Sequence, residues 1–226
     1  MSQDLIIAGA GGMAREVREL IESTGLYHII GFVAPGDAGT TIDGLPVLGD
    51  DSFLLEYQQD LNVVIALGDG AERSRLYQLY RSNPRLAFPS VISPGAHISP
   101  SASYGLGCII AHSAVISTDA RLGAFCFLSF NATVGHDCVL ADFVSLNPGA
   151  HLSGNVTVGR CAMFGSGCAV RQGLHIGTHA TVGMASSVIR DVEDDTSVIG
   201  VPAQPFFRRK KRSSETQAAT APYPAQ

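Results

Sequence analysis

A six-residue repeat runs without a break in register from Ile92 to Val188, and it constrains the fold more than any other feature. Every sixth residue over this stretch is apolar. A short fixed period is typical of a solenoid, in which each repeat buries its apolar side only by stacking on its neighbours. Six residues match neither a strand alternation nor a helical heptad. The apolar positions are Ile92, Ile98, Tyr104, Ile110, Ile116, Leu122, Leu128, Val134, Leu140, Leu146, Leu152, Val158, Phe164, Val170, Ile176, Val182 and Val188.

The position four residues after each of these apolar residues is usually small, most often Ala or Cys. One large aliphatic residue and one small residue per hexad suit a short strand followed by a tight corner. Three hexads then close a triangular coil of eighteen residues, so residues eighteen apart stack vertically. We expect residues 89–203 to form about six such coils, with Gly, Pro, Asn and Ser supplying the corners.

Residues 1–88 have a different pattern, which predicts a small parallel α/β domain of Rossmann type. Its glycine loop, residues 9–12, follows a buried strand and opens a helix, so it can hold phosphate oxygens at the helix N-terminus. The loop also fits NAD, but the second strand lacks the acidic end that a dinucleotide site expects. A nucleotide diphosphate sugar is therefore favoured. The expected strands are residues 4–8, 28–33 and 62–67, and the expected helices are residues 13–23 and 72–80.

Composition narrows the class of protein. The chain is 46% hydrophobic and 15% charged, which allows a sizeable core, and its net charge of −5 argues against a nucleic-acid partner. We find no secretory signal and no stretch near the roughly 18 apolar residues of a membrane span, so we expect a cytoplasmic protein.

The cysteines fit this reducing compartment. We expect Cys108, Cys126, Cys138 and Cys168 to fill small buried hexad positions as free thiols, whereas Cys161 falls off the hexad position and is expected at the surface. Because the chain has no CxxC pair, we also expect no zinc-thiolate site and no metal cofactor.

The composition of residues 204–226 differs from that of the repeat before them. The basic run at residues 208–212 is followed by a polar tail rich in Ala and Pro. This composition predicts a basic, disordered terminus. The alternative is a basic edge near a phosphate-bearing ligand or an anionic membrane surface.

Four motifs together resemble the PglD/NeuD-like family of bacterial sugar acetyltransferases. They are the loop at residues 9–12, the segments at residues 134–138 and 145–150, and the Gly-Val-Pro-Ala end at residues 200–203. The resemblance covers roughly residues 4–203. It implies a left-handed parallel β-helix after the Rossmann-like domain, and a homotrimer with active sites between subunits.

The resemblance also implies the activity. Members transfer an acetyl group from acetyl-CoA to a sugar, commonly to the amine of a nucleotide-linked amino sugar in surface-polysaccharide or glycan biosynthesis. The general base of the family is a histidine followed by an aspartate, which is His136 here. A histidine can take the proton of the attacking amine near neutral pH, since its ordinary pKa is near 6.5.

Stacking arithmetic adds Gly154 to this site, because it lies eighteen residues after His136. A glycine there brings its backbone N–H close to a thioester oxygen, and the family uses a backbone amide at the matching position. The alternative is a corner glycine that needs a positive φ. The family likewise implies that the backbone amides of Ser166 and Met184 bind the pantetheine arm of CoA.

The remaining expected contacts are with the nucleotide sugar and come mainly from the α/β domain. Ser145 matches a family histidine that lies near the acetyl group. The expected substrate-binding residues are Gly9, Gly11, Gly12, Met13, Gly68, Asp69 and Ser145.

The chain departs from the family pattern beside the catalytic histidine and in the crevice of the α/β domain, where the glycine loop and the ends of the strands are expected to meet the nucleotide. The residue before the histidine is often acidic in the family but is Gly135 here, so Asp137 and Asn155 are the candidates that orient the imidazole. Met13 replaces the usual histidine at the end of the glycine loop. The second strand also lacks its acidic end, which leaves the nucleotide open.

Three other functions compete with N-acetyl transfer. The nearest is O-acetylation of a sugar hydroxyl, as in sialic acid modification. A zinc hydrase on the same β-helix would need three converging histidines, which the hexad positions do not supply. A trimeric scaffold that keeps the fold without catalysis is the non-enzymatic alternative.

Overall fold

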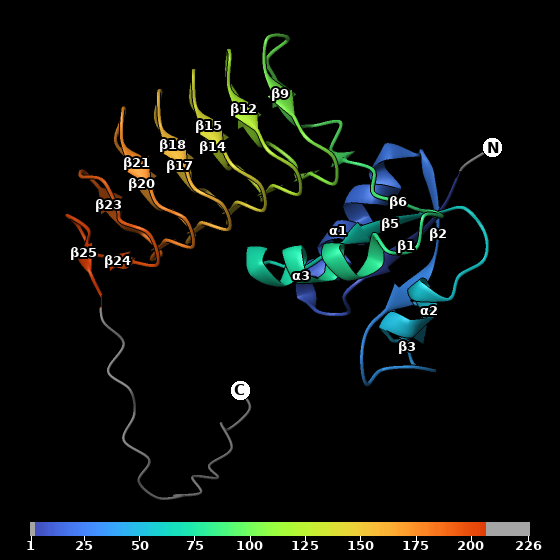
Figure 1. Ribbon diagram of the computed structural model, residues 1–226. Helices are drawn as coiled ribbons and strands as arrows, with labels where there is room; N and C mark the ends of the chain where they lie inside the picture. Colours follow the sequence, from blue (N-terminus) through green and yellow to red (C-terminus); the bar gives the residue numbers. More distant parts are fainter. Residues whose placement is uncertain (1–2, 207–226) are drawn as a thin grey trace, which may run out of the picture.

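The computed structural model describes residues 3–206, so the basic run at residues 208–212 lies outside the described residues. Figure 1 shows an α/β domain beside a long coil of short strands, with α3 on the side of the domain that faces the coil. The α/β sheet ends with β6 at Ala87, and the first strand of the coil begins at Val91. None of the helices within residues 3–206 is both long and apolar enough to span a membrane.

The α/β domain is built on a six-stranded sheet in the order β3-β4-β2-β1-β5-β6. All neighbours are parallel except β3 and β4, which form an antiparallel pair. Its strands are β1 (Gln3–Ala8), β2 (Tyr27–Val33), β3 (Thr41–Ile42), β4 (Leu45–Gly49), β5 (Leu61–Ile65) and β6 (Leu86–Ala87). Its helices are α1 (Gly12–Thr24), α2 (Asp51–Leu55) and α3 (Gly70–Tyr80).

The local sequence explains most of these elements. α1 buries the apolar face of Val17, Leu20 and Ile21, and it ends at Gly25 in the left-handed conformation that favours glycine. The structure adds β3, β4, β6 and α2, which the sequence analysis does not predict. α2 begins because the Asp50 carboxylate caps it by accepting from the backbone N–H of Ser52 at 2.9 Å.

The hexad region is a left-handed parallel β-helix of three sheets. The first sheet holds β7 (Val91–Ile92), β10 (Ile109–Ile110), β13 (Phe127–Leu128), β16 (Ser145–Leu146), β19 (Met163–Phe164), β22 (Thr181–Val182), β24 (Ser197–Ile199) and β25 (Gln204–Pro205). The second holds β8 (His97–Ile98), β11 (Val115–Ile116), β14 (Thr133–Val134), β17 (His151–Leu152), β20 (Ala169–Val170) and β23 (Ser187–Val188). The third holds β9 (Ser103–Tyr104), β12 (Arg121–Leu122), β15 (Val139–Leu140), β18 (Thr157–Val158) and β21 (His175–Ile176).

The expected eighteen-residue stacking is confirmed by the strand register. Val134, for example, pairs with Leu152, and the hexad residues form one continuous core through the coils. The final coil is shorter, because Val182 pairs with Val198, sixteen residues on. After it, β25 pairs antiparallel with β24, so a strand forms at residues 204–205, where the sequence analysis begins the tail.

The β-helix has three rows of corners, which we name by the sheet that each one follows. The first, second and third corners follow strands of the first, second and third sheets. From Gly107 to Ala185, the third residue after each apolar hexad residue has a positive φ. Asn, Asp and Gly occupy about half of these positions, as the steric preferences of the left-handed region favour.

The third corners and the first sheet lie against the α/β domain. α1 packs on Ile109 and Phe127 of the first sheet. The third-corner residues Phe125, Phe143 and Cys161 pack with α3 residues in a second cluster. The prediction that Cys161 is exposed is therefore wrong, since this side chain is 7% exposed under the α/β domain.

Candidate active site

His136 projects from a second corner, directly after β14. Its side chain is 49% exposed, and its Nδ1–H donates to Asp137 Oδ2 at 2.8 Å. Asp137 has a φ of 58°, a left-handed conformation that aspartate tolerates better than most residues. Because Nδ1 holds the proton on this side, Nε2 is left with its lone pair free to accept one.

Of the two candidates for orienting the imidazole, the structure brings Asp137 into contact. Asn155 instead uses its backbone, with its N–H donating to the His136 carbonyl at 2.8 Å. Gly135 lies so close to the next coil that a Cβ there would be 2.6 Å from the Ser153 carbonyl carbon. An acidic side chain before the histidine would not fit this backbone without a shift.

Gly154 lies under the imidazole of His136, as the stacking arithmetic predicts. A Cβ on Gly154 would overlap Nε2 and Cε1 of the ring and would be 2.8 Å from Cδ2. The alternative that Gly154 supplies a positive φ is wrong, because the left-handed residue of this corner is Asn155 (φ 56°). Because Gly154 has no side chain, the imidazole of His136 can lie directly against its backbone.

Ser166 and Met184 stack along the first corners. The Ser166 carbonyl accepts from the Ala185 N–H at 2.8 Å, and the Met184 side chain is 72% exposed. Within residues 3–206, no group accepts from the backbone N–H of Gly154, Ser166 or Met184. The corresponding N–H of Ala124, at a third corner, donates to Asp142 Oδ1 at 2.8 Å. The backbone N–H groups of Gly154, Ser166 and Met184 are therefore unpaired within the described part of the chain.

The expected crevice residues of the α/β domain do come together. β1 and β5 are neighbours, so the loops that follow them share one edge of the sheet, and Met13 Sδ lies near Gly68. A Cβ on Gly11 or Gly12 would meet nothing within 4 Å, which leaves open space beside the α1 N-terminus. Gly9 is closely packed, since its Cβ would be 2.9 Å from the Ala66 carbonyl oxygen.

Asp69 caps α3, because its Oδ1 accepts from the backbone N–H groups of Ala71 and Glu72 at 2.8 and 3.3 Å. The carboxylate therefore has a structural contact at the crevice edge. No acidic residue occupies the first turn of α1, so its N-terminus remains suited to an anion.

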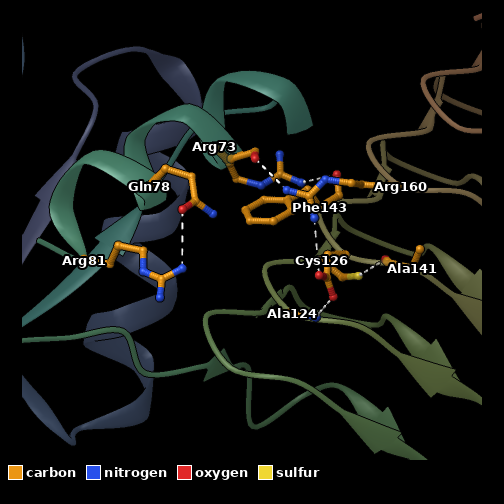
Figure 2. A network of polar contacts seen from close by, with 10 residues as sticks. Arg73, Gln78, Arg81, Ala124, Cys126, Ala141, Phe143 and Arg160 are labelled. Carbon is orange, nitrogen blue, oxygen red and sulfur yellow. Dashed lines mark hydrogen bonds and ion pairs between the residues drawn. The ribbon is translucent and has the colours of Figure 1, made fainter.

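Ser145 lies away from any open surface and is fully buried. Its hydroxyl donates to the Gly68 carbonyl at 2.8 Å and accepts from Arg73 Nη2 at 2.9 Å. Figure 2 shows Arg73 reaching from α3 to the β-helix beside Phe143. The sequence analysis did not find Arg73, which is only 1% exposed.

One chain does not bring all of these residues together. His136 and Gly154 lie at second corners, Ser166 and Met184 at first corners, and the start of α3, directly after Gly68 and Asp69, lies against the third corners. Among residues 3–206, no group of three or more His, Cys, Asp or Glu is arranged to hold a metal ion.

Comparison with known proteins begins with the α/β domain. A family model described as the PglD N-terminal domain matches residues 4–80. The acetyltransferase domain of PglB from Neisseria gonorrhoeae is 32% identical, with a TM-score of 0.85, and the match covers 91% of this chain and all of that domain. The chain belongs to the PglD/NeuD-like family of bacterial sugar acetyltransferases.

Other members of the PglD/NeuD-like family agree over nearly the whole chain. PerB from Caulobacter crescentus, solved with CoA and GDP-perosamine, is 32% identical with a TM-score of 0.85, and the match covers 90% of this chain and 97% of PerB. WeeI from Acinetobacter baumannii AYE is 27% identical with a TM-score of 0.84, and the match covers 91% of this chain and all of WeeI. None of the curated proteins compared with the chain matches it.

Proposed function

We propose that the protein transfers the acetyl group of acetyl-CoA to the amine of a nucleotide-linked amino sugar. The observation that carries this proposal is the imidazole of His136, held by Asp137 and seated over Gly154. Support comes from relatives: PglB's acetyltransferase domain was solved with acetyl coenzyme A, and a perosamine N-acetyltransferase was solved with CoA and GDP-perosamine. Residues 1–88 bind the nucleotide sugar in this proposal, and residues 89–203 carry the acetyl transfer.

The reaction follows from the atoms of the site. The neutral sugar amine attacks the thioester carbonyl, and His136 Nε2 takes the proton that the nitrogen loses as the tetrahedral intermediate forms. Asp137 keeps the Nδ1 proton in place and stabilises the imidazolium. The Gly154 N–H donates to the developing oxyanion. The carbon–sulfur bond then breaks, and the imidazolium returns its proton to the CoA thiolate.

The distribution of these residues over the corners supports an active site between subunits. The second corner with His136 and the crevice beside the third corners lie on different edges of the triangle. A neighbouring copy related by rotation brings a second corner of one chain against the crevice or first corner of the next. We therefore propose a homotrimer in which each site uses two chains.

Thiol release from acetyl-CoA tests this proposal. The panel contains UDP-, dTDP-, GDP- and CMP-linked sugars with amino or hydroxyl acceptors, and His136→Ala is assayed beside wild type. We expect turnover with an amino sugar and a loss of at least about 10² in kcat/KM in the variant, as removal of a general base causes. A variant with wild-type turnover would refute the base, and turnover only with hydroxyl acceptors would refute N-acetylation.

A further inference from the structure

Arg73 is a buried cation that joins the crevice to the β-helix. Its Nη1 donates to the carbonyls of Leu67 and Gly68 at 2.7 and 3.0 Å. Its Nε and Nη2 donate to coil carbonyls at Phe125, Phe143 and Val144 at 3.0 to 3.2 Å. One guanidinium therefore holds the loop after β5 and two successive coils.

Arg73 has no ion-pair partner within residues 3–206, and its acceptors are carbonyls and the Ser145 hydroxyl. Burial lowers the pKa of Arg73 to about 10, so the guanidinium still carries its charge at neutral pH. A buried charge is costly unless its hydrogen bonds are complete, and this one uses all three nitrogens. The fork geometry of arginine suits such a set of fixed acceptors.

Next to Arg73, the backbone at the start of α3 also packs tightly against the coils of the β-helix. A Cβ on Gly70, the first residue of α3, would overlap the Phe143 carbonyl oxygen and would be 3.3 Å from Cys161 Cα. The Ser145 hydroxyl closes the contact, since it bonds both Arg73 and the Gly68 carbonyl. The backbone of residues 67–70 thus has little freedom relative to the β-helix.

We propose that Arg73, with Ser145, is a positioning residue for acetyl transfer, which fixes the edge of the nucleotide-sugar crevice relative to the β-helix. This inference rests on the proposed function. The α/β domain holds the acceptor and the β-helix holds the acetyl donor, so the distance between amine and thioester depends on how the two parts are joined. A misplacement of about 1 Å at reacting groups lowers a rate by about 10²-fold.

Arg160 offers a matched control for this role. It also crosses from the β-helix to α3, because its Nη2 donates to Ser74 Oγ at 2.7 Å and its guanidinium lies 4.5 Å from the centre of the Phe143 ring. It makes no contact with residues 67–69 among its described hydrogen bonds. Arg73→Lys and Arg160→Lys therefore both weaken the contact between α3 and the β-helix. Only Arg73→Lys also removes hydrogen bonds to the carbonyls of Leu67 and Gly68.

The first test is steady-state kinetics at 25 °C on Arg73→Lys, Ser145→Ala and Arg160→Lys, with the nucleotide sugar found for wild type. We expect kcat to fall at least about tenfold in Arg73→Lys and less in Ser145→Ala, with KM for acetyl-CoA unchanged in both. Arg160→Lys should keep kcat while its thermal midpoint falls. If Arg73→Lys keeps kcat while its midpoint falls, Arg73 only stabilises the fold and the proposal is wrong.

Amide hydrogen exchange tests, without any turnover, whether Arg73 and Ser145 hold residues 67–70 against the β-helix. We expect the segment at residues 66–72 to exchange at least about tenfold faster in Arg73→Lys and Ser145→Ala than in wild type, with no such change in Arg160→Lys. Equal exchange of this segment in wild type and all three variants would refute the positioning role of Arg73 and Ser145, even if the enzyme is active. Absence of turnover with every sugar in wild type would overturn the proposed function instead, so the two failures are separate.

Discussion

Gly154→Ala adds a single methyl group under the imidazole of His136, the proposed general base. The residue has no positive φ, so alanine fits the backbone, but the new Cβ would overlap Nε2 and Cε1 of His136. Ordinary carbon contacts are about 3.5 Å or longer, so the ring must move by about 1 Å. A displacement of this size lowers kcat by about 10²-fold, which corresponds to about 2.7 kcal/mol.

The same assay of thiol release separates two roles for Gly154. If the glycine acts by seating the imidazole, Gly154→Ala lowers kcat in wild type but has no further effect in the His136→Ala background. Alanine keeps the backbone N–H, so if Gly154 acts only through that group, Gly154→Ala leaves kcat unchanged in both backgrounds. Wild-type kcat in Gly154→Ala, with the fold intact, would refute the argument from the ring contact.

Two further predictions concern hydrogen-bonded carboxylates. Asp137→Asn removes the charged acceptor of the His136 Nδ1 proton, so we expect kcat to fall about tenfold with KM for acetyl-CoA unchanged; an unchanged kcat would contradict the orienting role. Burial and the hydrogen bond to Asp51 raise the pKa of Tyr80, so the folded state keeps the phenol proton that the unfolded chain loses above about pH 10. That stabilisation is present below pH 10 and is lost as the pH rises further, so the free energy of unfolding measured in urea should decline less between pH 9 and 11 in Tyr80→Phe than in wild type.

The β-helix could be predicted from the sequence because its core repeats. One apolar and one small residue per hexad set both the strand positions and the register, as the pairing of Val134 with Leu152 confirms. The elements β3, β4, β6 and α2 could not be predicted in the same way, because segments of two to five residues contain too little periodicity. The sixteen-residue final coil also lies beyond the regular hexads.

The candidate site likewise contains residues that the sequence predicts and one that it does not. His136 follows from the family motif, and Gly154 follows from the eighteen-residue stacking of the repeat. Arg73 could not be found, because it shares α3 with Arg75, and nothing in the local sequence tells the buried arginine from the exposed one. Its burial comes from coils more than fifty residues away. The small residues Gly70 and Ser145 are the signals that a close contact lies there.

The residues with positive φ show what each row of corners faces. Their side chains stand at the corners, and a bulky residue in the left-handed region costs about 1–3 kcal/mol unless its surroundings compensate. Phe125 and Phe143 occupy this position at third corners, where their rings stack 5.1 Å apart under the α/β domain. Asp137 and Asn155 occupy it at second corners, which are open. The same backbone position therefore packs against the α/β domain on one edge and places Asp137 beside His136 on another. In the proposed homotrimer, acetyl transfer needs both edges to meet across two chains.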